Sequence, residues 1–364
     1  MDQLEYMKLA ISLARSTQGQ TSPNPVVGAV VVNNGEIVGM GAHLRAGEAH
    51  AEVNAINQAG NRAKGSDIYV TLEPCSHYGK TPPCADLIIE KGLNRVFIAS
   101  TDPNPLVAGK GIEKLKKAGI EVETGICEKE ALQLNEHFFH YIQTGTPFVT
   151  LKAAVTLDGK AASYTGDSKW ITSSQSRLDV HNDRHRHDAI LVGINTVLQD
   201  NPLLTTRLPQ GGKNPIRIIL DTHLKIPIES QVITDSSAKT IIICGSQFKL
   251  NQKQKLESLG IEVLPLTSST ISIIEVLKLL GERKVTSLYV EGGSSIHSSF
   301  LKENAFQKLI MYMAPKLVGG KNAYSSFSGD GFSTIAEATS LEFQSVDKIG
   351  SDLKIVATPK HEGG

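Results

Sequence analysis

The sequence predicts two successive α/β domains, and three observations support this prediction. Strand-like runs alternate with helix-like segments along the chain, a pattern typical of helices packed on both faces of a largely parallel sheet. With 364 residues, of which 40% are hydrophobic, the chain is long enough to form two cores. The turn-forming sequence Thr-Gly-Thr-Pro at 144–147 ends a helical segment, so we expect one domain at 1–145 and another at 146–364.

The elements of the first domain can be assigned in order. An amphipathic N-terminal helix precedes a hairpin with strands at 26–32 and 36–42, because Asn34-Gly35 favours a tight turn between two β-rich runs. Apolar residues at 49, 53 and 56 then predict a helix that begins near His50. The remaining predicted elements are a strand at 67–72, a helix that opens at Cys84 after two prolines, a strand at 95–100, a helix at 110–118, a strand at 120–124 and a helix at 128–143.

The second domain repeats the alternation. Its predicted elements are a strand at 148–156, a turn at Asp158-Gly159, a helix from Ser174 into a His/Arg-rich cluster, and strands at 189–193, 216–220 and 240–244. A further strand runs from 287 through Gly292-Gly293 into a helix whose exposed amides favour an anion, although a plain strand-to-helix turn has the same sequence. No Gly-x-Gly-x-x-Gly stands at a strand-to-helix junction, so an ordinary dinucleotide-binding fold is not supported.

Three candidate metal ligands and one carboxylate are grouped between positions 50 and 84. One histidine and two cysteines leave the fourth position of a tetrahedral Zn²⁺ to water, and such a zinc ion lowers the pKa of that water to about 7. A glutamate two residues after the histidine and a proline before the first cysteine are typical of hydrolytic deaminases, whose non-ligating glutamate transfers protons. We therefore expect His50, Cys75 and Cys84 to bind one zinc ion, and Glu52 to be catalytic.

Other interpretations of these residues are a redox pair beside a surface histidine, a structural zinc site that lacks its fourth ligand, and a disulfide between the two cysteines. A structural zinc would require neither Glu52 nor Pro74. The chain has only four cysteines, which fits a reducing cytosol and disfavours the disulfide. The N-terminal segment has the spacing of an amphipathic helix and not of a signal peptide, and no stretch approaches the length of a membrane span. We expect a cytoplasmic protein without membrane contact.

The net charge of the chain indicates which class of partner is favoured. The 37 basic and 37 acidic residues cancel, and no Lys/Arg-rich block occurs. A nucleic-acid partner is therefore disfavoured, although a local basic groove is compatible with zero net charge.

The basic residues of the second domain have two interpretations each. Arg184 and Arg207 are suited to clamp a phosphate by bidentate hydrogen bonds, whereas any single arginine is by default exposed. The cluster His181, His185 and His187 has metal-binding residue types, but a solvated helix face is the favoured interpretation of its spacing.

Longer motifs carry a resemblance to a known family. The string Pro-Cys-Ser-His-Tyr-Gly-Lys-Thr-Pro-Pro-Cys at 74–84 puts eight residues between cysteines that most zinc deaminases separate by two, and it resembles the deaminase domain of the bifunctional riboflavin-biosynthesis deaminase/reductase. The segments 152–160, 166–172 and 192–197, with Asp-Asn-Pro at 200–202, resemble the reductase domain of the same family.

This resemblance implies a cytidine-deaminase-like three-layer α/β domain followed by a dihydrofolate-reductase-like α/β domain. The first would release ammonia from a diaminopyrimidinone ribosylamine phosphate in a zinc-dependent reaction, and the second would use NADPH to reduce the ribosyl group to ribityl. Family members self-associate, so the resemblance also implies a homo-oligomer with a small phosphorylated pyrimidine as substrate.

The resemblance also assigns contacts. The deaminase substrate contacts would be Asn24, His43, His77, Lys80, Asp102 and Asn104, although 102–105 also reads as a simple Asn/Pro turn. The reductase substrate contacts would be Ser168, Arg184, Leu204, Arg207 and Glu291. The NADPH contacts would be Ala154, Trp170, Thr196, Asp200, Thr222, Gly293, Ser294, Ser295, Ile296, His297, Ser298 and Ser299.

Two alternatives from other functional classes remain. One is a deaminase that acts on nucleic acid, against which the neutral charge and the long spacing of the cysteines count. The other makes the second domain a non-catalytic binding or oligomerisation module, which a failure to bind NADPH would favour.

Overall fold

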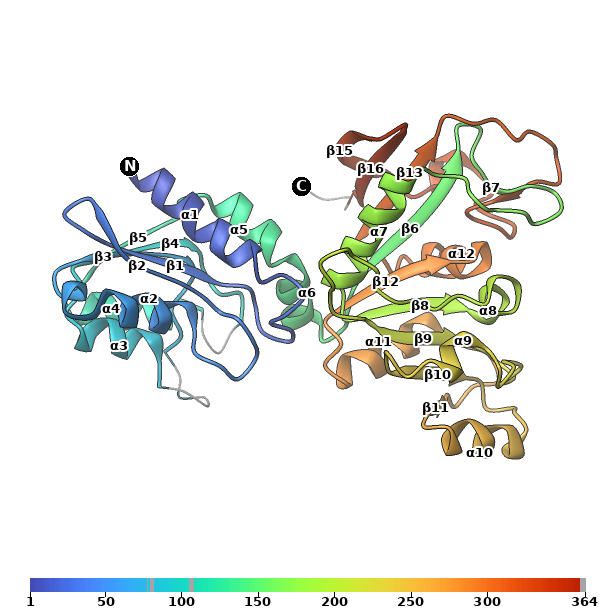
Figure 1. The fold of residues 1–364 in the computed structure, drawn as a ribbon, viewed down its shortest axis with the longest axis horizontal. Helices are drawn as coiled ribbons and strands as arrows, with labels where there is room; N and C mark the ends of the chain where they lie inside the picture. The colour runs from blue at the N-terminus through green and yellow to red at the C-terminus, as the bar shows by residue number, and fades with distance from the viewer. Residues whose placement is uncertain (77, 79–81, 105–107, 361–364) are drawn as a thin grey trace. The chain divides into compact units, whose positions relative to one another are not determined.

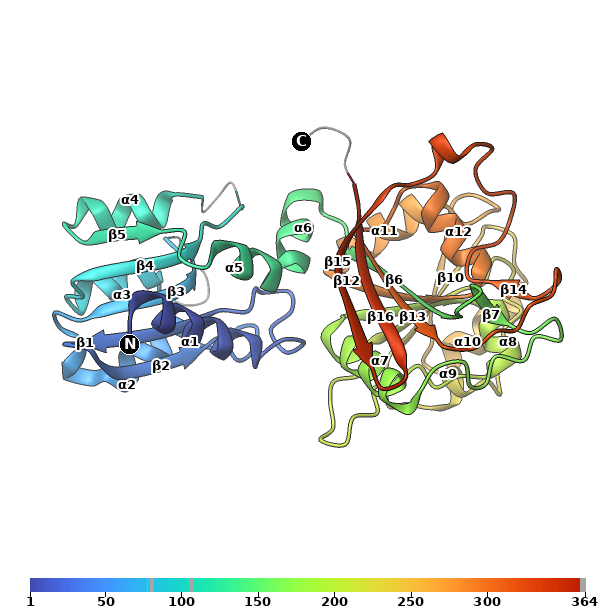
Figure 2. The same cartoon turned by 90° about the horizontal axis from the view of Figure 1, so that it is seen from above.

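The computed structural model describes residues 1–76, 78, 82–104 and 108–360. The chain forms two compact units, Met1–Gly145 and Thr146–Gly364, and each unit contains its own sheet. Helices cover both faces of each sheet (Figures 1 and 2). The α/β class predicted from the alternating pattern is therefore confirmed for both halves of the chain.

Within its described residues, the first unit has a five-stranded sheet in the order β2-β1-β3-β4-β5. Strand β1 pairs antiparallel with β2 and β3, whereas β3, β4 and β5 run parallel. The strands are β1 (Gly28–Asn33), β2 (Glu36–Ala42), β3 (Asp67–Leu72), β4 (Arg95–Ser100) and β5 (Glu121–Thr124). The helices are α1 (Gln3–Arg15), α2 (Ala51–Ala59), α3 (Cys84–Glu90), α4 (Lys110–Lys117), α5 (Glu128–Leu134) and α6 (Glu136–Thr144), with a short 3₁₀ turn η1 (Gly60–Ala63).

The alternation of side chains along β1 divides this unit into three layers. Ala29 and Val31 join the core formed with α2, α3 and α4, whereas Val30 and Val32 join the core formed with α1 and α5. Successive residues of a strand point to opposite faces, so a run of valines is buried on both sides.

Helix α2 lies unusually close to the sheet because glycines face it. A Cβ atom at Gly39 would lie 2.0 Å from the carbonyl oxygen of Ala55, and one at Gly41 would lie 2.3 Å from that of Ala51. No larger residue fits at either position without moving the helix. These glycines therefore set the depth at which the first turn of α2 is held.

The single helix expected at 128–143 is instead two helices, α5 and α6, separated at Asn135. The side chain of Asn135 is buried and pairs with the backbone of Val26, accepting from its amide at 2.9 Å and donating to its carbonyl at 3.0 Å. An asparagine that bonds to a distant backbone in this way competes with helix continuation.

In the described part of the second unit, a nine-stranded sheet has the order β11-β10-β9-β8-β12-β6-β13-β16-β15. The strands from β11 to β13 are parallel, and β16 and β15 extend the sheet antiparallel. The strands are β6 (Phe148–Thr156), β8 (Ala189–Gly193), β9 (Ile216–Leu220), β10 (Thr240–Cys244), β11 (Glu262–Pro265), β12 (Ser287–Gly292), β13 (Lys308–Ala314), β15 (Leu341–Ile349) and β16 (Asp352–Pro359); β7 (Lys160–Ala162) and β14 (Tyr324–Ser325) pair separately.

Two cores flank this sheet. One contains side chains of α11 (Ile273–Glu282) and α12 (Ser294–Lys302), and the other contains side chains of α7 (Ser174–Arg186), α8 (Ile194–Asp200), α9 (Gln231–Thr234) and α10 (Leu250–Ser258). The carboxyl ends of the parallel strands are left for the connecting loops, where open α/β sheets bind ligands. Among the described helices, none is long and apolar enough to cross a membrane.

Candidate functional site: a metal-binding triad and a paired Arg/Glu cluster

Three elements of the first unit bring the predicted metal ligands together. His50 is the N-cap residue of α2, Cys84 is the first residue of α3, and Cys75 lies in the loop that follows β3. His50 Nδ1 lies 3.2 Å from Cys84 Sγ and 3.6 Å from Cys75 Sγ, and the three ligand atoms lie within 4.8 Å of one another. The expected histidine and cysteines therefore converge on one point.

The spacing of these atoms fits zinc. Zn–S distances of about 2.3 Å and Zn–N distances of about 2.0 Å place the ligand atoms of a tetrahedral site roughly 3.5 to 3.8 Å apart. A hydrogen bond from the Cys84 thiol, assisted by His50, lowers the pKa of Cys75, which favours a thiolate at this position. The bond to Cys75 and burial raise the pKa of Cys84. A cation that replaces the shared proton would satisfy both sulfur atoms.

Glu52 lies in the first turn of α2, next to the triad. Its side chain is 3% exposed and interacts with the Cys84 thiol. Burial, and then the negative charge of Cys75, raise the pKa of Glu52 above its ordinary value. A buried carboxyl group with a raised pKa is suited to exchange protons near neutral pH.

Asn24 and His43 form a second polar group beside the triad. The His43 ring lies 5.4 Å from the His50 ring, centroid to centroid, and burial lowers the pKa of His43, which keeps it neutral. Its Nδ1 donates to the carbonyl oxygen of Ala49 at 3.1 Å, so Nε2 accepts from the Asn24 amide nitrogen at 3.1 Å. This chain of bonds fixes which end of the Asn24 amide is the donor.

The other expected deaminase contacts lie on loops. Asp102 is 9% exposed, and its carboxylate accepts from the amide of Asn104 at 2.8 Å, which closes the turn after β4. The predicted contacts His77 and Lys80 lie outside the described residues.

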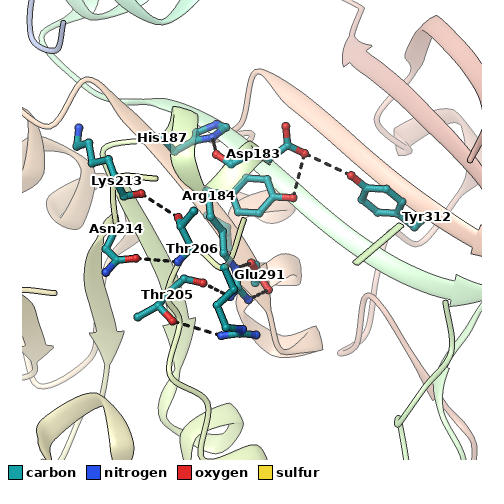
Figure 3. A network of polar contacts seen from close by, with 12 residues as sticks. Asp183, Arg184, His187, Thr205, Thr206, Lys213, Asn214, Glu291 and Tyr312 are labelled. Carbon is teal, nitrogen blue, oxygen red and sulfur yellow. Dashed lines mark hydrogen bonds and ion pairs between the residues drawn. The ribbon is translucent and has the colours of Figure 1, made fainter. Parts of the chain in front are cut away.

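In the second unit, Arg184 of α7 and Glu291 of β12 form a buried bidentate ion pair. Arg184 Nε donates to Glu291 Oε1 at 2.6 Å and Nη2 donates to Oε2 at 3.0 Å, while Nη1 donates to the carbonyl oxygen of Thr205 at 2.9 Å. Figure 3 shows the Arg184 side chain directed at Glu291 with Thr205 close by. Arg207 donates to Thr205 Oγ1 at 3.3 Å and so joins this cluster.

Two further charges act on this pair. Although burial alone would raise the pKa of Glu291, the charges of Arg184 and Lys152 lower it to about 2. Burial lowers the pKa of Lys152, against the opposing effect of Glu291. Burial, with the charges of Arg184 and Arg207, also lowers the pKa of His181 to about 4, so His181 is a neutral member of the cluster.

The expected cofactor contacts follow the carboxyl ends of neighbouring parallel strands. Thr196 after β8 accepts from the amide of Gly293 after β12, with 3.1 Å between Thr196 Oγ1 and the nitrogen, and Thr222 follows β9. Ala154 lies on β6, which stands in the sheet between β12 and the antiparallel strands β16 and β15. Asp200 forms a 3.4 Å ion pair with Lys169.

Three of the expected reductase contacts differ in exposure. The Trp170 ring is 63% exposed and packs against the Arg177 guanidinium, 4.6 Å from the ring centroid. The His297 ring is buried between the carbonyl oxygens of Ser326 and Val290, so its imidazole is part of the support for the Gly292-Gly293 turn. Leu204 is buried with a φ of 54°, a conformation that is uncommon for leucine.

Comparisons with known proteins agree with both halves of this description. The family described as RibD C-terminal domain matches residues 147–355, and the family described as cytidine and deoxycytidylate deaminase zinc-binding region matches residues 1–100. The riboflavin biosynthesis protein RibD of Bacillus amyloliquefaciens is 56% identical over 355 residues, which covers 98% of this chain and 96% of that protein. The chain belongs to the RibD family.

Solved structures of this family have the same two-unit fold. RibD of Acinetobacter baumannii matches with a TM-score of 0.89 and 37% identity, covering 98% of this chain and 99% of that one. A diaminohydroxyphosphoribosylaminopyrimidine deaminase/5-amino-6-(5-phosphoribosylamino)uracil reductase of Thermotoga maritima matches with a TM-score of 0.87 and 38% identity, covering 98% of both chains. The predicted deaminase-like and reductase-like folds are confirmed.

As a member of the RibD family, the protein is a bifunctional deaminase and reductase of riboflavin biosynthesis. It combines a zinc-binding deaminase domain with a reductase domain that uses NADPH. Small phosphorylated pyrimidines suit such an enzyme as substrates.

Two interpretations of the basic residues in the RibD-type reductase unit were wrong. His187 is 4% exposed, and its ring bonds to the carbonyl oxygen of Asp183 and to Thr150, so it does not belong to a solvated helix face. His185 accepts from the amide of Lys213 instead, and among the described residues only His50, Cys75 and Cys84 form a potential metal cluster. The default exposed interpretation of Arg184 also fails, because that side chain is buried.

Lys152 belongs to the charged cluster around Glu291, but the sequence predicted no role for it. Its signal was a single lysine inside the otherwise uncharged strand β6, where a buried charge needs a nearby partner. The partner, Glu291, lies 139 positions later in the chain, so only the fold reveals it.

Proposed function

We propose that residues 1–145 catalyse hydrolytic deamination of the diaminopyrimidinone ribosylamine phosphate, and that residues 146–364 reduce the ribosyl group of the resulting aminouracil to ribityl with NADPH. The convergence of His50, Cys75 and Cys84 beside the buried Glu52 is the observation that carries the first half of this proposal. The charged cluster around Glu291, next to the carboxyl edge of the parallel sheet, supports the second half.

In the deaminase reaction, His50, Cys75 and Cys84 would hold Zn²⁺, which lowers the pKa of a coordinated water molecule. Glu52 takes a proton from the attacking water and returns it to the ring amine, so ammonia leaves and a carbonyl group remains. Asn24 and neutral His43 orient the heterocycle, and Asp102, Asn104, His77 and Lys80 complete the contacts to base and phosphate. Two observations support these roles: Asn24 bonds to His43, whose ring lies next to that of His50, and Asp102 and Asn104 form the polar turn after β4.

In the reductase reaction, hydride transfer depends mainly on positioning the nicotinamide against the sugar C1. We assign the cofactor to Ala154, Trp170, Thr196, Asp200, Thr222 and the 293–299 turn, and the substrate to Ser168, Arg184, Leu204, Arg207 and Glu291. Arg207 meets the phosphate, because the fork of Arg184 is already engaged by Glu291. The Arg184–Glu291 pair then presents polar atoms to the sugar hydroxyls.

The proposal extends to partners and compartment. The zero net charge favours a small-molecule substrate over nucleic acid, and the free cysteines fit a reducing cytoplasm. A homo-oligomer is favoured by edge strand β15, on which Phe343 is 70% exposed and Val346 is 55% exposed. Light scattering of the purified protein tests this last point, and a monomer at micromolar concentration would reject it.

The decisive experiment follows ammonia release and NADPH oxidation in one sample that contains zinc-loaded protein and the diaminopyrimidinone ribosylamine phosphate. We expect ammonia and oxidised NADPH in equal amounts. Ammonia without NADPH oxidation would reject the assignment of the second unit, and neither signal from folded, zinc-loaded protein would reject both.

A further inference from the structure

A buried carboxylate that takes no part in the proposed chemistry follows strand β3. Glu73 is 4% exposed, and its two oxygens accept four backbone amides. Oε1 accepts from Gly111 at 3.0 Å and from Ile112 at 3.3 Å, while Oε2 accepts from Gly109 at 3.0 Å and from Asp102 at 3.4 Å. Bonds from amides to a carboxylate are stronger than those to a neutral acceptor, so this group binds its surroundings firmly.

Three of these amides form the start of helix α4. The N-cap residue Gly109 has a left-handed φ of 75° and no side chain with which to cap the helix. The first amides of a helix need an acceptor and attract negative charge. Glu73, which is 36 positions earlier in the chain, supplies both.

A close backbone contact reinforces this junction. A Cβ atom at Gly111 would lie 2.1 Å from the carbonyl oxygen of Pro74. Only glycine therefore allows the first turn of α4 to lie directly against the residue that precedes Cys75. The carboxylate and the glycine together hold α4 on the loop that carries a metal ligand.

The fourth amide belongs to the segment that follows β4. Asp102 donates its amide to Glu73 and accepts the amide of Asn104 with its own carboxylate at 2.8 Å. Glu73 itself donates its amide to the carbonyl oxygen of Ser100 at 3.0 Å, which continues the pairing of β3 with β4. One side chain thus connects the Cys75 loop, the start of α4 and the Asp102–Asn104 turn.

We propose that Glu73 is a positioning residue for deamination, which holds Asp102 and Asn104 at a fixed distance from the metal-binding triad. This inference rests on the proposed function, in which that turn contacts the deaminase substrate. Without the carboxylate, the turn loses the bond that ties the Asp102 amide to Glu73, while the ligands His50, Cys75 and Cys84 remain. The substrate then binds less well, although the hydrolytic chemistry is retained.

Glu73→Gln tests this in the full-length, zinc-loaded protein, because an amide group turns one acceptor oxygen into a donor that faces N–H groups. We expect the deaminase KM to rise about tenfold or more, with kcat changed less than about threefold, as for a lost positioning contact. Zinc content should stay at one ion per chain, and the reductase rate should not change when the deaminated aminouracil substrate is supplied directly. Glu73→Asp, which keeps the charge, should restore part of the KM.

Asp67→Asn is the matched control. Asp67 lies at the other end of β3 and forms a 2.5 Å ion pair with Arg95, so its loss weakens the same strand without touching the turn. Its deaminase KM should equal that of the wild type. Gly111→Ala is a second, independent variant, because its Cβ forces α4 away from Pro74 and should raise KM in the same way.

An unchanged KM in both Glu73→Gln and Gly111→Ala would overturn the proposal. The proposal would also be overturned if both variants lost zinc while the molecules that kept zinc had a normal KM. Glu73 would then only support the loop that carries Cys75. Failure of the proposed function looks different, since the wild-type protein itself would release no ammonia.

Discussion

The two units build their sites in different ways. The deaminase site draws its candidate metal ligands and the proposed catalytic carboxylate from 35 consecutive positions, His50 to Cys84, on two helix starts and one loop. The reductase cluster joins residues from Lys152 to Glu291, which the parallel sheet brings to one place. Metal chemistry demands particular residue types at particular spacings, whereas hydride transfer demands positions that only the fold supplies.

The two sites also differ in how their charges are balanced. In the first unit, hydrogen bonds from Cys84 and His50 lower the pKa of Cys75, which favours a negative charge that a cation can neutralise. In the second unit, Arg184 and Glu291 already neutralise each other in a buried bidentate pair. A single substitution should therefore stop chemistry in the first unit and disturb both structure and chemistry in the second.

The sharpest test of this difference is Glu52→Gln. Because the amide cannot accept and return a proton, the deaminase kcat should fall about a thousandfold. The ligands are untouched, so zinc content should match that of the wild type, and so should the reductase rate when the deaminated aminouracil substrate is supplied directly. Glu48→Gln, on the exposed loop before His50, is the control and should stay within about twofold. Loss of zinc in Glu52→Gln would show that the carboxylate has a structural role instead.

Arg184→Lys tests the role of the buried Arg184–Glu291 ion pair in the second unit. Lysine cannot replace the bidentate fork, so the reductase kcat/KM should fall about a hundredfold and the unfolding free energy of the second unit should drop by about 3 kcal/mol. Kinetics and chemical denaturation measure the two effects, and ammonia release serves as the internal reference. Arg186→Lys, an exposed position on the same helix, should change neither quantity. If Arg184→Lys keeps full activity, the pair is not part of the substrate site.

This contrast also explains how much the sequence could predict. The convergence of His50, Cys75 and Cys84 could be predicted because a His, a Glu and two Cys with a preceding proline form a local pattern. The alternation of elements likewise predicted the strands of the first sheet and strands β6, β8, β9, β10 and β12 of the second, but not β11 or β13. Strands β15 and β16 also escaped notice, since β15 is mostly exposed and β16 is mostly half-buried, so neither shows a strong hydrophobic pattern.

Side chains that bond to distant backbone were beyond prediction for a different reason. Glu73 and Asn135 have no local partner, and the amides that they bind lie 29 to 39 positions away for Glu73 and 109 positions away for Asn135. An Asn inside a helical pattern and a Glu before a Pro-Cys pair each have ordinary local interpretations. Only the tertiary structure distinguishes these interpretations.

A pH effect on stability is expected in the second unit from the buried His187. Burial lowers the pKa of His187 to about 4, from an ordinary value near 6.5. Between these values the unfolded chain takes up a proton that the folded chain does not, so stability falls as pH decreases through this window. At pH 5 the loss relative to neutral pH should be about 2 kcal/mol.

Urea unfolding at several pH values measures this dependence. His187→Gln should be less stable than the wild type at neutral pH but should lose about 2 kcal/mol less on acidification. His223→Gln, at an exposed position of the same unit, controls for the loss of one histidine. An unchanged acid sensitivity in His187→Gln would mean that other buried groups dominate.

Trp170→Ala should have the smallest effect and would show how exposed cofactor contacts behave. The ring is largely exposed and is held by the Arg177 guanidinium, so its removal takes away one stacking surface and leaves the buried Arg184–Glu291 pair intact. We expect the KM for NADPH to rise about fivefold with kcat nearly unchanged, since the contact is equally present in ground and transition states. Tyr164→Ala, another exposed aromatic residue before α7, should leave the KM for NADPH unchanged. A fall in kcat for Trp170→Ala would instead place the ring at the reacting atoms. The reductase site would then depend on one side chain as strongly as the deaminase site depends on Glu52.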